Sequence, residues 1–257
     1  MSQAFEVGGI GLEAQQKALD VIANNIANLN TAGFKRADVQ FVDLMAQRSD
    51  PEHLTAALTG DDATTAGVMA RSVLALNEQG TVEQTGKPMD LAINGAGFIE
   101  LMGAHGQSLL WRGGTLQVGE DGLLGAGNGL ALRASISVPD DATNLQIDQS
   151  GVVSAQLTGS SSRSQLGQIM LVKVDTPDAV QRLDGGFYQV SDGVRLSEVV
   201  PGEDGAGLLA QGSVEHSNVN INDELVRLMI VQRAYGANAQ IVQAADQLAS
   251  IANSLRR

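Results

Sequence analysis

The chain has 257 residues, of which 29 are acidic and 16 basic, for a net charge of −13, and it contains no cysteine. This acidity excludes the basic surface that displaces counterions from nucleic acid, and the lack of cysteine excludes disulfides and thiolate metal sites. With 30 glycines and only 3% aromatic residues, the composition favours turn-rich β structure over a compact catalytic core.

The first predicted element is an amphipathic helix from about Gly11 to Leu29. Its apolar residues recur at helical intervals along one face: Leu12, Leu19, Ile22, Ile26 and Leu29. Three asparagines lie in its last turns: Asn24, Asn25 and Asn28. Asparagine is a mediocre helix former, so this cluster beside an apolar seam predicts hydrogen bonds to a partner helix that set its register. The alternative is a fraying helix end closed by Gly33 or Asn30 in the left-handed conformation.

The next stretch mixes apolar residues with polar and small ones. A short helix or turn is expected over residues 38–47, a flexible excursion over 49–67, and a strand over 71–76. From Asp90 onward the sequence pattern changes to short runs in which apolar and polar residues alternate. Glycine turns such as Asn94-Gly95 and Asp148 to Gly151 separate these runs. This pattern predicts an antiparallel β-rich domain that extends to about Pro201.

Helical periodicity returns at the C-terminal end, where a helix of about 35 residues, roughly 50 Å long, is predicted. Asn218, Asn220 and Asn222 are candidate N-caps, and Asp223 and Glu224 suit the first turn. One apolar ladder comprises Ile230, Ala234, Ala237, Ile241, Ala244, Leu248, Ile251 and Leu255. A second ladder comprises Leu228, Val231, Tyr235, Val242, Ala245, Ala249 and Ala252. Two stripes on one long helix need two neighbours, and we expect the N-terminal helix and another subunit.

Candidate sites for chemistry are weak. His53, His105 and His216 lack metal-ligand spacing, so surface positions are expected for all three. The glycines at 122, 125, 127 and 129 lack the lysine and following helix of a phosphate loop. Asp140 and Asp141 follow Pro139 and indicate a turn. An exported peptidoglycan-acting enzyme or a monomeric β-sandwich binding module remain alternatives, and no catalytic residue, metal or cofactor is expected.

Export signals are also absent from the sequence as given. Its first residues lack the basic and apolar regions of a cleavable signal peptide, and no apolar run reaches the ~18 residues of a membrane span.

Three stretches resemble the bacterial flagellar basal-body rod and hook proteins. The first is Asn24-Asn25-Ile26-Ala27-Asn28 with Asn30-Thr31 and Gly33-Phe34-Lys35. The second is Gln84-Thr85-Gly86 to Gly97-Phe98, with Arg112-Gly113-Gly114. The third joins Gly212, Glu215, Ser217 to Asn220 and Val231 to Tyr235.

The resemblance implies an α+β fold in which the long N- and C-terminal helices pair as a coiled coil. The residues between them would form a central antiparallel all-β domain. The segments would be an N-terminal helix (1–33), a connecting segment (34–84), a β-rich domain (85–205) and a C-terminal helix with its lead-in (206–257). It implies a structural protein of the periplasm-spanning rod, without an enzymatic role, that self-assembles helically around the export channel and transmits torque. Within the family the chain looks most like the distal rod member, with a proximal rod or hook-type member as the alternative.

The resemblance also implies partners: further copies of the chain, other rod, hook and ring proteins, and the flagellar type III export apparatus, without a cleaved signal peptide. Neither nucleic-acid binding nor membrane insertion is expected. The predicted assembly surface comprises Leu12, Leu19, Ile22, Asn24, Asn25, Ile26, Asn28, Leu29, Gly33, Phe34, Asn218, Asn220, Leu228, Tyr235, Ile241, Val242, Leu248, Ile251 and Leu255.

Overall fold

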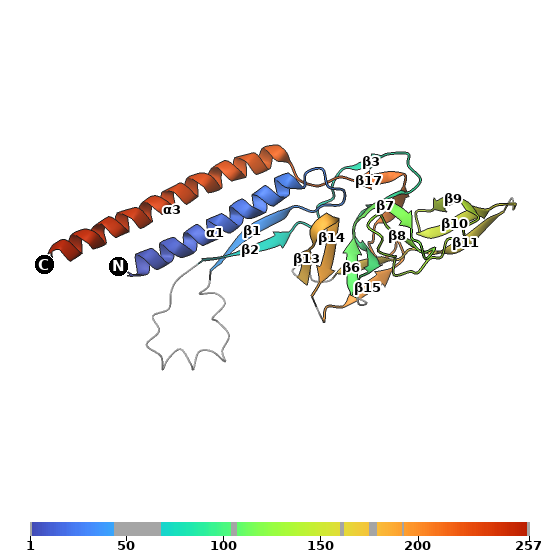
Figure 1. The fold of residues 1–257 in the computed structure, drawn as a ribbon, viewed down its shortest axis with the longest axis horizontal. Helices are drawn as coiled ribbons and strands as arrows, with labels where there is room; N and C mark the ends of the chain where they lie inside the picture. The colour runs from blue at the N-terminus through green and yellow to red at the C-terminus, as the bar shows by residue number, and fades with distance from the viewer. Residues whose placement is uncertain are drawn as a thin grey trace. The chain divides into compact units, whose positions relative to one another are not determined.

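The computed structural model describes residues 2–43, 68–103, 107–159, 162–174, 179–191 and 193–255. They form two compact units. The helical unit contains both long helices and a two-stranded sheet; the β unit contains residues 28–36 and the chain from Leu74 to Val219. The expected α+β class, with a largely antiparallel β region and two helices, is confirmed (Figure 1). The predicted excursion over 49–67 lies outside the described residues, as do His53 and His105.

Helix α1 spans Ser2–Ala27, so it begins nine residues before the predicted start at Gly11. The added turns contain Gly8 and Gly9, and glycine has a low helix propensity. In the structure two glycines of α1 face the second helix: a Cβ at Gly8 would lie 2.7 Å from Val242, and one at Gly11 would lie 3.1 Å from Asn238. These glycines allow close helix packing, and this tertiary contact outweighs their intrinsic propensity.

The predicted short helix or turn over 38–47 is wrong for residues 38–43, the part that the structure describes. Strand β1 (Ala37–Asp43) occupies its described part and pairs with β2 (Val68–Leu74) in a two-stranded sheet. Long-range pairing decided the conformation here, because a short apolar run does not by itself distinguish a strand from a helix.

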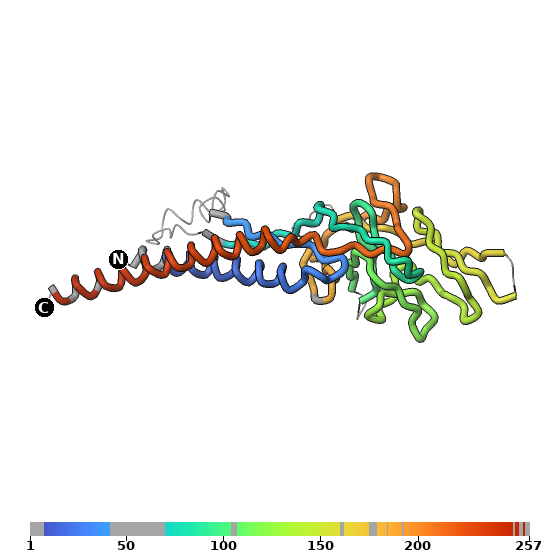
Figure 2. The backbone as a smooth tube through the Cα atoms, turned by 90° about the horizontal axis from the view of Figure 1, so that it is seen from above, coloured from blue at the N-terminus to red at the C-terminus, as the bar shows by residue number. Residues whose placement is uncertain are grey.

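Helix α3 spans Ile221–Leu255, 35 residues, as predicted. Asn220 caps it, since its Oδ1 accepts a hydrogen bond from the Asn222 amide at 3.0 Å, and Asp223 and Glu224 occupy the first turn. Helices α1 and α3 lie side by side (Figure 2). They are antiparallel, because Gly8 faces Val242 while the later Gly11 faces the earlier Asn238.

The described residues of the β unit form four antiparallel sheets. Their orders are β13-β14-β6-β5-β12-β15, β16-β4-β7-β8, β11-β10-β9 and β17-β3. The strands are β3 (Val82–Gln84), β4 (Asp90–Asn94), β5 (Phe98–Met102), β6 (Ser108–Trp111), β7 (Gly113–Val118), β8 (Leu124–Ala126), β9 (Ala142–Ile147), β10 (Val152–Leu157), β11 (Arg163–Gln168), β12 (Leu171–Val174), β13 (Val180–Arg182), β14 (Phe187–Val190), β15 (Leu196–Val199), β16 (Leu208–Gln211) and β17 (Ser213–Glu215), with a 3-10 turn η4 (Asp184–Gly186).

Two of the predicted glycine turns are hairpins. Gly122 (φ 73°) joins β7 to β8, and Gly151 (φ 86°) joins β9 to β10. Asn94-Gly95 is a turn but not a hairpin, because β4 pairs with β7 and β16 instead of with β5. The main core of the β unit contains the single tryptophan, Trp111, which is buried among aliphatic side chains.

Candidate functional site

The face of α3 that meets α1 largely follows the second predicted ladder, except that Tyr235 is exposed while Ala234 of the first ladder is partly buried. Leu228, Val231 and Val242 are partly buried, and Asn238 occupies the position of this ladder that the apolar pattern skipped. On α1 the most buried residues are Ala14, Ala18, Ile22 and Asn25, spaced by three or four. The predicted stripe residues Leu12, Leu19 and Ile26 are only partly buried. The seam of α1 is therefore centred on small residues, beside the larger apolar side chains.

The first predicted ladder of α3 faces away from α1. Ile230, Ile241, Leu248 and Ile251 are between 56% and 63% exposed. Tyr235 is also exposed, and the side chain of Leu255 lies outside the described residues. We call Ile230, Ile241, Leu248 and Ile251 the outward stripe. The exposed face of α1 is polar instead, with Glu13, Gln16, Lys17, Asp20 and Asn24. Within one chain, the outward stripe is unburied apolar surface of the kind that marks an interface.

The predicted hydrogen bond to a partner helix is wrong for Asn25, which bonds to strand β1 instead. Its side chain is 1% exposed, and its Nδ2 donates to the Ala37 carbonyl at 2.8 Å while its Oδ1 accepts from the Ala37 amide at 3.0 Å. The amide thus pairs with the backbone of β1 as a neighbouring strand would. Asn28 belongs to the turn after α1, where it accepts a hydrogen bond from the Thr31 hydroxyl at 3.1 Å.

Gly33 adopts the predicted left-handed conformation, with φ of 68°, but it does not close the helix. Helix α1 has already ended at Ala27, and the Gly33 amide donates to the Glu215 carbonyl at 2.8 Å. Phe34 is buried, with the Arg182 guanidinium 4.4 Å from its ring centroid. Both residues dock the N-terminal segment on the β unit.

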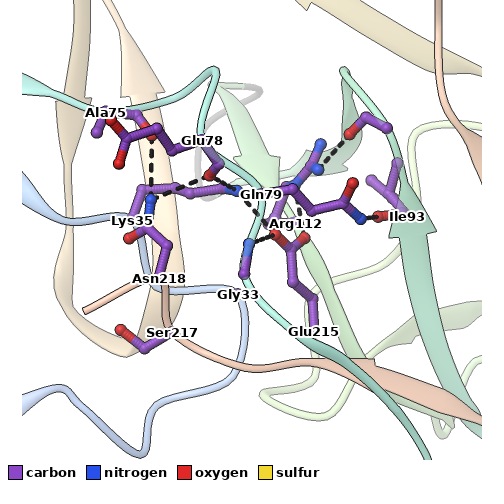
Figure 3. A network of polar contacts seen from close by, with 12 residues as sticks. Gly33, Lys35, Ala75, Glu78, Gln79, Ile93, Arg112, Glu215, Ser217 and Asn218 are labelled. Carbon is purple, nitrogen blue, oxygen red and sulfur yellow. Dashed lines mark hydrogen bonds and ion pairs between the residues drawn. The ribbon is translucent and has the colours of Figure 1, made fainter. Parts of the chain in front are cut away.

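A buried ion cluster lies where this segment docks (Figure 3). Glu215 Oε1 lies 2.7 Å from Lys35 Nζ, and Glu215 Oε2 lies 2.8 Å from Arg112 Nε. The side chains of Lys35 and Glu215 are 1% exposed and that of Arg112 is 3% exposed. The Arg112 guanidinium also donates to the carbonyls of Gly95 and Gly97. Two cations thus share one carboxylate in a site without solvent.

Backbone contacts complete the docking of residues 33–36. The Tyr188 hydroxyl donates to the Gly33 carbonyl at 3.0 Å and accepts from the Lys35 amide at 2.9 Å. Asn218 accepts from the Arg36 amide at 2.6 Å and donates to the Glu78 carbonyl at 3.0 Å. Asn218 therefore links three stretches of the chain and does not cap α3.

The sequence patterns did not single out Lys35, Arg112, Tyr188 and Glu215 as site residues. Lys35, Arg112 and Glu215 occur in the three family-like stretches, but neither periodicity nor spacing shows that they meet. The local signal for the cluster is a charged residue with no neighbouring opposite charge inside such a stretch. The sequence does not show that Lys35 and Glu215, 180 positions apart, are partners, because their pairing depends on the tertiary structure.

The cluster makes the stability of the β unit depend on pH. Burial lowers the pKa of Lys35, and the Arg112 guanidinium lowers this pKa further, against the opposing effect of the Glu215 carboxylate. Between the folded-state pKa and the ordinary value of 10.5, the unfolded chain binds more protons. The free energy of unfolding contributed by Lys35 therefore rises as pH rises through this window.

We expect the difference in unfolding free energy between the parent chain and Lys35→Met to shift in favour of the parent as pH rises from about 8 to 10. Urea unfolding followed by Trp111 fluorescence measures it. The window stops near pH 10 because burial raises the pKa of Tyr188 above its ordinary 10.0, so the unfolded tyrosine ionises first. A difference that is constant with pH would contradict the lowered pKa.

Of the three histidines, the structure describes His216 alone. His216 is exposed and lies 2.6 Å from the Glu83 carboxylate. In the described part of the chain, no cluster of three metal-ligating side chains occurs and no helix is long and apolar enough to cross a membrane.

Comparison with known proteins yields three matching family models. They are described as flagella basal body rod protein (residues 5–35), flagellar hook protein FlgE/F/G D1 domain (92–155) and flagellar basal body rod FlgEFG protein C-terminal (210–255). The chain is 33% identical to the flagellar basal-body rod protein FlgG of Caulobacter vibrioides, over 99% of both chains. It is 34% identical to FlgG of Buchnera aphidicola, over 96% of this chain and 97% of that one, and 29% identical to FlgG of Bacillus subtilis over the full length of both.

Proposed function

Since the chain belongs to the family of flagellar basal-body rod proteins, we propose that its copies assemble into the distal part of the rod through the outward stripe of α3. Membership makes it a structural component of the basal body, not an enzyme, that interacts with other basal-body components. The relatives named FlgG favour the distal rod over the proximal or hook-type alternative.

The observation that carries self-assembly is the asymmetry between the two helices. The outward stripe residues follow one another at intervals of eleven, seven and three along α3, so these side chains share one face. Helix α1 already covers most of the second ladder, on the other face of α3. A second copy is the occupant that fits, because a structural rod is built by repeated subunits and a repeated subunit brings the same apolar stripe to every contact.

The same helices support an intramolecular coiled coil. Buried and partly buried positions repeat by three and four on both helices, which is the spacing of a heptad seam. Small residues at the α1 seam let the helix axes approach closely. We propose that this antiparallel pair is the subunit's building element and that it packs around the export channel.

Export and neighbours follow as further parts of the proposal. The chain would leave the cytoplasm through the flagellar type III apparatus without a cleaved signal peptide, and it would transmit torque between rod and hook. Ring and hook proteins would contact it at the ends and outside of the assembly. The composition supports this route, since a chain without cysteine cannot form disulfides when it crosses into an oxidising compartment.

Cysteine accessibility tests the proposal, and the cysteine-free sequence provides a clean background. Concentrated protein is inspected by electron microscopy for tubes or filaments, and Ile241→Cys is labelled with a maleimide before and after assembly. We expect labelling of Ile241→Cys to fall at least tenfold on assembly, because the outward stripe becomes buried. Lys17→Cys, on the polar face of α1, serves as the control and keeps its reactivity. Protein that forms no filaments, or filaments in which Ile241→Cys stays reactive, would contradict the proposal.

A further inference from the structure

We propose that Glu215 couples the docking of two segments far apart in the sequence, residues 33–36 and 211–218, so that each is held on the β unit only when the other is in place. Glu215 is a positioning residue here, acting through the groups it bonds. This coupling is a property of the single chain and goes beyond the proposed assembly.

The N-terminal segment depends on the C-terminal one at four contacts. Lys35 Nζ lies 2.7 Å from Glu215 Oε1, and the Gly33 amide donates to the Glu215 carbonyl at 2.8 Å. The Arg36 amide donates to Asn218 Oδ1 at 2.6 Å, and the Asn218 amide donates to the Phe34 carbonyl at 3.4 Å. Without residues 211–218, the buried Lys35 ammonium would lose the carboxylate to which it is bonded.

The C-terminal segment depends on Lys35 in return. Glu215 Oε1 accepts two hydrogen bonds, from Lys35 Nζ and from the Gly80 amide at 2.9 Å. Lys35 Nζ also donates to the Glu78 carbonyl at 2.7 Å, and Asn218 Nδ2 donates to that same carbonyl at 3.0 Å. The turn at 78–80 is thus bonded by both segments, and removing either one takes away hydrogen-bond partners of this turn.

The coupling has a consequence for how the chain enters and leaves the β unit. Residues 28–36 follow α1 and residues 216–219 precede α3, and Phe34 and Asn218 are bonded to each other. Both connections to the helices are therefore anchored at one point. Strand β17 pairs with β3 over only three residues, so the ladder alone is a short anchor for the C-terminal connection.

Hydrogen exchange on the full chain, at a concentration where it is monomeric, tests the coupling. We expect Lys35→Met to raise the exchange rates of the Gly80 and His216 amides at least tenfold, although neither amide bonds to Lys35. The amides of β10 should change less than twofold. In the reciprocal arm, Asn218→Ala should raise the exchange rate of the Gly33 amide, whose acceptor is the untouched Glu215 carbonyl.

Three controls separate coupling from general destabilisation. Lys35→Arg keeps a cation and should restore part of the protection at Gly80. Glu83→Gln removes an exposed carboxylate on β3, opposite Val214 on β17, and should leave both segments unchanged. Asn218→Ala leaves no buried charge unpaired, so this arm remains informative if Lys35→Met does not fold. The proposal is overturned if Lys35→Met affects only residues 33–36, or if β10 exchanges faster to the same degree.

Discussion

Replacing Ile241 and Leu248 together with aspartate is expected to abolish assembly while leaving the single chain folded. Both side chains are more than half exposed in the chain, at 57% and 63%, so neither charge is buried before assembly. In an assembled stripe each carboxylate would be buried without a partner, at a cost of several kcal/mol, on the order of 3 to 5 for each unpaired buried charge. Sedimentation and electron microscopy measure assembly, and circular dichroism measures helix and strand content.

The matched control adds the same two charges to polar positions of the same helix. Gln240 and Gln247 are exposed, and Gln240→Asp with Gln247→Asp gives the same net charge change. This variant should keep assembling, because it leaves the outward stripe intact. Equal loss of assembly in both variants would attribute the effect to helix charge, and normal assembly of the stripe variant would refute the interface.

Replacing Glu215 with alanine is expected to produce the largest loss of stability in the β unit. The change leaves the Lys35 ammonium and the Arg112 guanidinium buried beside each other, with no carboxylate and with side chains 1% and 3% exposed. Breaking a buried ion pair in this way costs about 3 to 5 kcal/mol. Denaturant unfolding followed by Trp111 fluorescence reports this unit, because the single tryptophan lies in its core.

Glu83→Ala provides the comparison, since Glu83 also pairs across the β3–β17 ladder but its side chain is 64% exposed. Exposed ion pairs contribute less than about 1 kcal/mol, so this variant should unfold almost as the parent does. A loss for Glu215→Ala no greater than that for Glu83→Ala would show that the cluster does not stabilise the unit.

The terminal helices illustrate how far the pattern of residues leads. The length of α3 and its acidic first turn were predicted correctly, because a heptad pattern repeated over 35 residues is a strong periodic signal. The second ladder is partly buried at Leu228, Val231 and Val242 but not at Tyr235, which is exposed. The start of α1 was not predicted correctly, since Gly8 and Gly11 lower the local helix propensity. Their packing role comes only from contact with Val242 and Asn238. Strand β1 was missed for the same kind of reason, because its conformation depends on pairing with β2.

The sequence by itself determined the helix at each end, the antiparallel character of the middle and the family to which the chain belongs. These follow from local periodicity, turn chemistry and characteristic stretches, all of which are carried by neighbouring residues. The tertiary structure alone decided which α3 ladder is covered by α1, where Asn25 bonds, and that Lys35, Arg112 and Glu215 meet. The physical reason is that burial and pairing join residues from different elements, 12 positions apart for Asn25 and Ala37 and 180 for Lys35 and Glu215, and no local pattern encodes which of them will meet.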